Sequence, residues 1–240
     1  MAETRAPIRI GIYGPELGQG EKHGCKLWPA GITASVIAAE AVPVALPENI
    51  ERSWGEVLED VQGVILAGHD THPRPNLNEA EALVSWCHDH NIPVLAIDHG
   101  LHLLNTAHGG TIHNDLSREL PEALQHRHPP EKGLRHAINV LPDTGLAALY
   151  GEGEVVVNSE HRRGIARLAR GFRVTAQALD GVIEAVETTG EWWALGVQWN
   201  PTSSTASGLD IQLFRALVNA CVRRLEPRET PAEEKSLSIA

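Results

Sequence analysis

Short apolar segments alternate along this chain with longer segments in which apolar residues recur at helical spacing. In the first hundred residues the apolar segments are Ile8–Tyr13, Val42–Leu46, Gly63–Ala67 and Pro93–Ile97. The last two contain no charged or hydrogen-bonding side chain, which is typical of strands buried on both faces. We therefore expect a central parallel sheet whose strands are connected by helices.

The segments between and after these strands have helical patterns. Helices are expected over residues 32–41, 54–60, 101–106 and 209–224. A further helix is predicted from residue 78, because Asn78 and Glu81 have the spacing of a capping box and apolar residues follow at positions 80, 83, 84 and 87. Cys87 lies on this apolar face and Cys221 on that of the last helix, so both are expected in the core.

The second half of the chain is predicted to add antiparallel ribbons to the sheet. Its strands are expected at Ala137–Val140, Val155–Val157, Phe172–Leu179, Val182–Val186 and Ala194–Val197. No internal repeat divides the chain, so we expect a single domain over residues 1–226. Residues 227–240 mix Pro, Glu, Lys and Ser without periodicity and are predicted to be a flexible tail.

The composition restricts the partners more than the fold. A net charge of −11 repels phosphate backbones and anionic lipids, so we expect neither nucleic acid nor a membrane as partner. The 3 cysteines form no CxxC pair and the N-terminal segment lacks the apolar run of a signal peptide, which favours a cytoplasmic protein. The 13 histidines are a surplus of the residue that shuttles protons and ligates metals near neutral pH.

The strongest candidate for chemistry is Asp98, which stands between the predicted strand Pro93–Ile97 and the next helix. A residue on such a tight turn is presented at the carboxyl end of a strand, where open α/β sheets bind ligands. The alternative is a structural role, because an aspartate carboxylate at this place can cap the helix. Local sequence alone favours the cap.

Five segments, in order and properly spaced, resemble class I glutamine amidotransferases, and within them the gamma-glutamyl-gamma-aminobutyrate hydrolase branch. They are Leu66–Pro73, Pro93–Asn105, Gly109–His113, Val157–His161 and Leu195–Thr202. The second is similar to the family's nucleophile elbow, the fourth matches V-N-S-x-H, and the fifth stands where the family has L-G-V-Q-W-H-P-E. The resemblance covers roughly residues 7 to 224 and implies a flavodoxin-like α/β fold.

The departures from the family pattern fall on its catalytic triad. The resemblance implies a Cys nucleophile, a His base and an orienting Glu, and these three positions are Asp98, Asn200 and Thr202. Loss of a whole triad costs on the order of 10⁶ in rate. We therefore expect a catalytically inactive homologue, a pseudoenzyme that binds a small ligand or a partner protein at the former active-site pocket.

An alternative keeps catalysis with a different chemistry, the hydrolysis of C–N bonds in gamma-glutamyl amides without a thiol. Carboxylate and imidazole ligands could hold a zinc ion that activates water. The residues of this alternative metal site are Asp98, His69, His99 and His102. The favoured hypothesis has no cofactor and no metal. A carboxylate nucleophile at Asp98 is a third, weaker hypothesis.

The residues expected to line the pocket come from the same five segments. They are Ala67, Gly68, His69, His99, Gly100, His102, Asn158, Ser159 and His161. Structural roles are expected for Gln198 and Trp199 beneath the site, and hydrogen bonds to loop backbone for His113 and His161. His126, His128 and His136 are predicted to lie in a solvated surface loop. The oligomeric state stays open, with a homodimer as one option.

Overall fold

The structure, a computed structural model, describes residues 6–14, 16–17, 25–26, 31–48, 50–68, 77–127 and 134–226. Its strands are β1 (Arg9–Tyr13), β2 (Glu16–Leu17), β3 (Cys25–Lys26), β4 (Val42–Ala45), β5 (Gly63–Leu66), β6 (Val94–Ile97), β7 (Thr111–His113), β8 (Arg135–Val140), β9 (Gly153–Asn158), β10 (Gly164–Arg167), β11 (Phe172–Ala178), β12 (Ile183–Thr188) and β13 (Ala194–Val197). Its helices are α1 (Ile32–Ala38), α2 (Trp54–Val57), α3 (Leu77–Asp89), α4 (His99–Ala107), α5 (Leu116–Glu119), α6 (Gly145–Tyr150) and α7 (Ile211–Leu225). The predicted tail lies outside the described residues, and so does the side chain of Cys25.

A nine-stranded sheet with the order β4-β1-β5-β6-β13-β12-β11-β8-β9 forms the centre of the molecule. The first five strands in this order are parallel, and the remaining neighbours pair antiparallel. The α/β class, the parallel centre and the added antiparallel strands are therefore confirmed. Ala194–Val197 was expected in an antiparallel ribbon, and this is wrong in part. β13 pairs antiparallel with β12 but parallel with β6, and so it belongs to the centre of the sheet.

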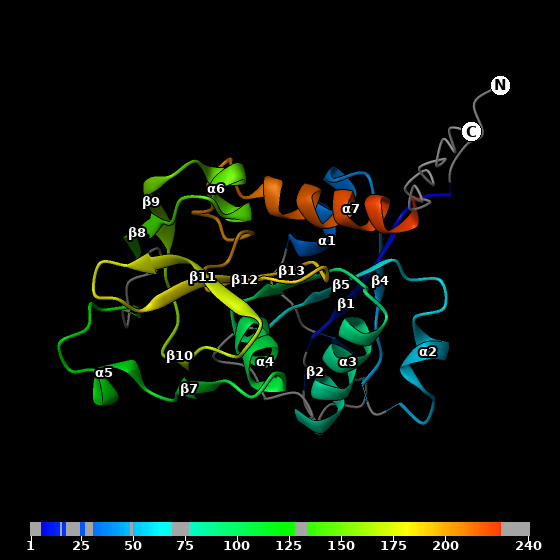
Figure 1. Cartoon of the computed structure of the whole chain (residues 1–240), viewed down its shortest axis with the longest axis horizontal. Coiled ribbons are helices and arrows are strands. Elements are labelled where there is room, and N and C mark those ends of the chain that lie inside the picture. Colours follow the sequence, from blue (N-terminus) through cyan, green and yellow to red (C-terminus); the bar gives the residue numbers. More distant parts are fainter. Residues whose placement is uncertain are drawn as a thin grey trace, which may run out of the picture.

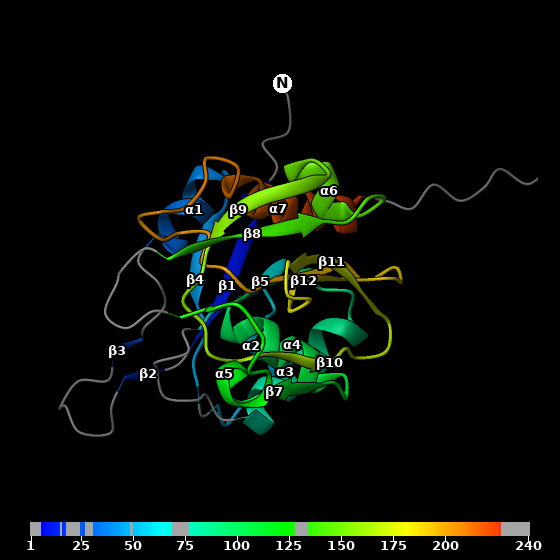
Figure 2. The same ribbon diagram turned by 90° about the vertical axis from the view of Figure 1, so that its left-hand side faces the viewer.

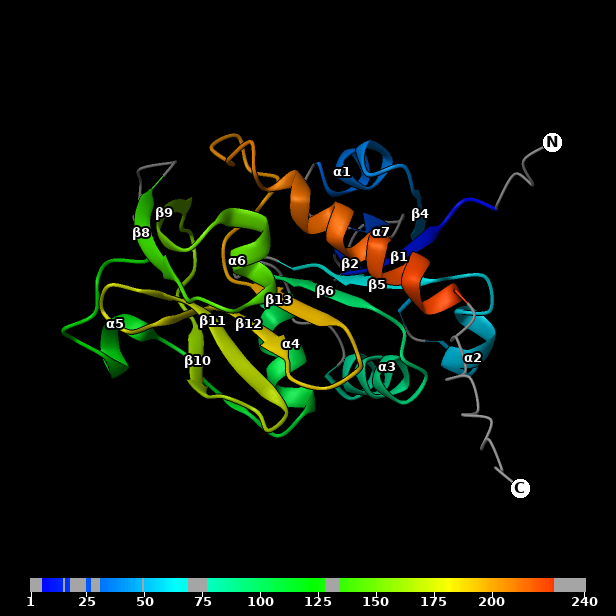
Figure 3. The ribbon, with the colours of Figure 1, turned by 45° about the horizontal axis from the view of Figure 1, so that its top comes forward.

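Helices cover both faces of the sheet, as crossover connections require (Figure 1). α1, α6 and α7 pack on one face over a core that includes Trp199 and Phe214. α2, α3 and α4 pack on the other face around Tyr13 and Leu83. Figure 3 shows α7 lying across the parallel strands. None of the described helices is long and apolar enough to cross a membrane.

One local prediction changes and another is confirmed. α3 begins at Leu77, so Asn78 lies inside the helix and does not cap it. Cys87 and Cys221 are fully buried, as predicted, and burial raises the pKa of both thiols to about 12. Neither can serve as a thiolate near neutral pH.

The antiparallel half of the sheet carries a second layer of loops. In Figure 2 the β8–β9 hairpin lies beside α6, while β7, β10 and α5 lie on the opposite side of β11 and β12. β7 and β10 form a separate two-stranded antiparallel sheet. The described residues after α5, as far as 127, meet the turn after β9 at this end of the molecule, since the backbone N–H of His161 donates to the carbonyl of His126.

Candidate functional site

Asp98 occupies the tight turn between β6 and α4 that the sequence predicts. Its backbone has φ 51° and ψ −111°, a conformation that residues with a Cβ rarely adopt, and the residue is buried. The first turn of α4 lies against the end of the neighbouring strand β5, because Gly100 lets these two backbones approach closely. A Cβ on Gly100 would lie 2.1 Å from the carbonyl oxygen of Leu66.

The Asp98 side chain does not cap α4, so the structural role that local sequence favours is wrong. Instead Gln198, which follows β13, donates a hydrogen bond of 2.9 Å from Nε2 to Asp98 Oδ1. The other end of the same amide, Oε1, accepts a bond of 2.8 Å from His102 Nε2. His102, Gln198 and Asp98 thus form one chain of buried hydrogen bonds at the end of β6.

The other two positions of the implied triad are bonded to each other. Asn200 Oδ1 accepts hydrogen bonds of 2.9 Å from both the backbone N–H and the hydroxyl of Thr202. The backbone of Asn200 is in turn held by Asn158, whose side chain donates to its carbonyl and accepts from its N–H. Neither Asn200 nor Thr202 can accept a proton as an imidazole or a carboxylate does, so this pair cannot supply the general base of a thiol hydrolase.

The loop opposite the elbow approaches it closely. Ala67 is buried, and its N–H donates to the carbonyl of Tyr13. A Cβ on Gly68 would lie 2.7 Å from Cβ of His99, so the end of β5 lies directly against the first residue of α4. His69 and His72 lie outside the described residues, and the predicted zinc set that includes His69 stays a prediction.

Asn158, Ser159 and His161, from the V-N-S-x-H segment, all have internal hydrogen bonds. Ser159 Oγ donates to the carbonyl of His126 at 2.7 Å. His161 is buried, and its Nδ1 donates to the carbonyl of Arg163 at 2.8 Å, which confirms the predicted bond to loop backbone. These contacts support the loop; a role in binding a ligand stays a prediction.

His126 and His136 do not lie on the surface, as the sequence analysis expected. The side chains of both are more than nine-tenths buried, and with His161 they surround the fully buried carboxylate of Glu184 on β12. Burial favours the neutral form of Glu184, but attraction to the imidazoles, His161 foremost, outweighs it and lowers its pKa to about 2. Burial likewise opposes charge on His161, and the Glu184 carboxylate beside it raises the pKa of that imidazole.

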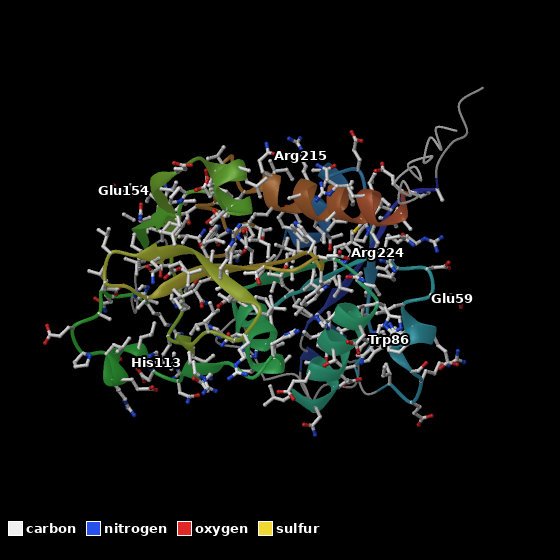
Figure 4. The ribbon with its side chains drawn as sticks, viewed as in Figure 1. Glu59, Trp86, His113, Glu154, Arg215 and Arg224 are labelled. Carbon is white, nitrogen blue, oxygen red and sulfur yellow. The ribbon has the colours of Figure 1, made fainter. Side chains whose placement is uncertain are left out.

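Sequence reasoning missed Glu184 altogether. The available signal was a single carboxylate in the middle of the apolar strand Val182–Val186, since a charge in such a strand must find partners when it is buried. His113, by contrast, lies at the periphery on β7 (Figure 4). Its Nδ1 is 2.8 Å from Glu119 Oε2. Its predicted bond to loop backbone is therefore replaced by a contact with a side chain.

The family profile of Peptidase C26 matches residues 10–202, a range that begins within β1 and ends at Thr202. The chain belongs to the Peptidase C26 family. Among curated proteins, it is 30% identical over 220 residues to the gamma-glutamyl-gamma-aminobutyrate hydrolase PuuD of Escherichia coli K12, covering 81% of this chain and 86% of the relative. It is 29% identical over 205 residues to protein NtpR of Enterococcus hirae, covering 75% and 85%.

A solved structure with the same fold is a glutamine amidotransferase from Methylobacillus flagellatus. The TM-score is 0.61 with 11% sequence identity, and the match covers 94% of this chain and 97% of the other. For a Peptidase C26 member, the notable feature of the site is its chemistry. The elbow presents a carboxylate bound by an amide, and the positions that the sequence resemblance assigns to the base and its orienting residue hold an Asn and a Thr bonded to each other.

Proposed function

We propose that this Peptidase C26 homologue is not a thiol hydrolase and that it binds a small molecule or a partner protein at the former active-site pocket. The observation that carries the proposal is the set of hydrogen bonds made by the side chains at the three positions that the resemblance assigns to the triad. Asp98 is bonded to Gln198, and Asn200 to Thr202. These side chains satisfy one another and do not prepare a nucleophile.

The energetics of the lost triad support the same proposal. Removing a complete catalytic triad lowers the rate on the order of 10⁶-fold, and what survives comes from substrate binding and from oxyanion donors. A fold that keeps its elbow conformation and its buried support, but loses the reacting groups, retains the means of binding without those of turnover.

The first test is a turnover assay with glutamine and with gamma-glutamyl-gamma-aminobutyrate as substrates, following released ammonia or amine. We expect no release above the uncatalysed rate from the wild-type protein. Asp98→Ala and Asp60→Ala serve as a matched pair, because Asp60 is an exposed aspartate whose ion pair with Arg9 is far from the elbow in sequence. Turnover that Asp98→Ala abolishes and Asp60→Ala preserves would contradict the proposal and favour the non-thiol hydrolase.

The second test measures binding of the same two compounds by titration calorimetry. We expect a complex with at least one of them that His99→Ala weakens about tenfold or more, since His99 lies between the elbow and the loop at Gly68. His88→Ala is the control, because His88 is a half-exposed histidine on α3. If neither compound binds, a partner protein is the remaining form of the proposal, to be sought by affinity capture from the native host with Gly68→Trp as the blocked variant. Capture of the same proteins by both forms would argue against the pocket.

A further inference from the structure

Four side chains from separate segments meet in the interior beneath the elbow. His126, His136, His161 and Glu184, here called the His₃Glu cluster, have ligand-type atoms that all lie within 4.8 Å of one another. Glu184 Oε1 is 3.3 Å from His126 Nδ1, 3.6 Å from His136 Nε2 and 3.3 Å from His161 Nε2. One oxygen thus faces three ring nitrogens at nearly equal distances.

Within the part of the chain that the structure describes, five buried polar atoms of the cluster have no hydrogen-bond partner. They are His126 Nδ1, His136 Nε2, His161 Nε2 and both carboxylate oxygens of Glu184. Buried polar atoms in folded proteins are almost always paired, and four such atoms that converge on one point, within 4.8 Å of one another, are not explained by packing. An ion at that point would satisfy them together.

The outer ring nitrogens, in contrast, are all engaged. His126 Nε2 contacts Asp180 Oδ2 at 2.9 Å, and His161 Nδ1 contacts the carbonyl of Arg163 at 2.8 Å. His136 Nδ1 contacts the carbonyl of the next residue at 3.2 Å. A carbonyl oxygen and an ionised carboxylate can only accept hydrogen bonds. The outer ring nitrogens must therefore be the donors and carry the protons. In its neutral form, an imidazole bonded in this way turns a lone pair inward, which is the arrangement by which outer partners orient metal-binding histidines.

The distances fit one class of ion. In a tetrahedral zinc site with bonds of 2.0–2.1 Å, neighbouring ligand atoms are about 3.3 Å apart. The separations of 3.3, 3.6 and 3.3 Å from Glu184 Oε1 to the three nitrogens match three of the six edges of such a tetrahedron, and all four ligand atoms lie within 4.8 Å of one another. Three imidazoles and one carboxylate suit zinc or a similar transition metal, whereas magnesium and calcium prefer a full set of oxygen ligands.

We propose that the His₃Glu cluster is a zinc site. Its four ligands come from the protein and are buried, which is typical of a closed structural site and leaves no position for a substrate water. The ion would tie together β8, β12, the segment after α5 and the turn after β9. It would also support the elbow, because the backbone N–H of Gln198 donates to the carbonyl of Glu184. This site shares no ligand with the set Asp98, His69, His99 and His102 considered above, and it does not rest on the proposed function.

The test begins with metal content. The full chain, purified without a histidine tag, is stripped with a strong chelator, reconstituted with zinc chloride, desalted and measured by plasma mass spectrometry. We expect about one zinc per chain. We also expect stripping to lower the melting temperature by about 10 °C. A free ion concentration of about a thousand times the dissociation constant stabilises the native state enough to shift the melting temperature by roughly this amount in a chain of this size. Cobalt in place of zinc should give the visible absorption of a tetrahedral site.

Variants separate the site from adventitious binding. His161→Gln should reduce retained zinc to less than about one tenth per chain, and His113→Gln, which changes a histidine outside the cluster, should retain it. Asp180→Asn, which alters only an outer partner and is the gentler change, should weaken zinc binding about 10- to 100-fold in competition with a chelating dye. These variants keep the test valid if one of them folds poorly.

Three results would overturn the proposal. The reconstituted wild type could hold less than about one tenth of a zinc ion with a melting temperature unaffected by the chelator, which would identify the cluster as a metal-free ion pair of Glu184 with a protonated His161. Zinc retained equally by His161→Gln would show adventitious binding. A visible spectrum of octahedral cobalt would exclude the four-ligand site.

Discussion

The backbone strain at Asp98 can be measured by comparing two variants, Asp98→Ala and Asp98→Gly. Both lose the carboxylate and its bond from Gln198, so they differ only in the Cβ at a residue with φ 51° and ψ −111°. A residue with a Cβ in such a region costs about 1–3 kcal/mol, whereas glycine adopts it freely but loses about 0.5–1 kcal/mol through the entropy of the unfolded chain. Glycine should therefore be the more stable variant by about 0.5–2 kcal/mol.

Urea denaturation followed by circular dichroism measures this difference. For a chain of this size, the free energy of unfolding falls by about 3 kcal/mol per M of urea. The unfolding midpoint of Asp98→Gly should therefore lie about 0.2–0.7 M above that of Asp98→Ala. Ala82→Gly is the control, because Ala82 is exposed on α3 and the same exchange there should lower stability by about 1 kcal/mol. If glycine is less stable than alanine at position 98, as it is expected to be at position 82, the backbone at the elbow is not strained and the prediction is wrong.

Three further variants test the packing around the sheet. Tyr150→Phe removes the hydroxyl that donates to buried Asp210, at an expected cost of about 1.5–3 kcal/mol at pH 7. Burial raises the pKa of Asp210 and the Tyr150 bond lowers it, so in the variant the folded-state pKa rises further above the unfolded value. Protonation of Asp210 then removes the buried charge, so the stability gap should shrink as the pH falls from 7 toward 4, and a constant gap in urea midpoints would contradict this. Gly100→Ala should cost about 3 kcal/mol or more, because its Cβ meets the Leu66 carbonyl; an unchanged melting temperature would refute the close approach. Asn105→Leu leaves two backbone carbonyls and one N–H without their partner and should cost at least about 3 kcal/mol, whereas a loss under 1 kcal/mol would indicate that water replaces the side chain.

The strands and helices of the parallel half were largely predictable because their signals are local. The apolar segments that become β5 and β6 are buried at every residue, as continuous apolar segments indicate. The pairing of β13 was not predictable in the same way. A short apolar strand of four residues can pair in a parallel or an antiparallel direction. That β13 lies parallel to β6 depends on the path of the long segment that connects the two strands.

The site shows the same division. The turn at Asp98 followed from the order of strand, turn and helix, but the partner of its carboxylate did not, because Gln198 is 100 positions away. The burial of His126 and His136 could not be read from a polar segment of sequence, since loop burial depends on what the rest of the chain packs against it. Only the isolated carboxylate of Glu184 in an apolar strand hinted that a polar centre lies there.

The position of β13 has a consequence for how the chain reaches its folded state. β6 lies between β5 and β13, and until residues 194–197 arrive one edge of this apolar strand has no partner in the sheet. Contacts between segments so distant in sequence form slowly, because a long loop must close before they contribute. During synthesis, the elbow and its neighbours would therefore be completed only after most of the chain has left the ribosome. Until then, β6 would expose an unpaired apolar strand edge that can associate with other chains. We expect C-terminal truncations before residue 194 to aggregate, not to yield a smaller folded domain.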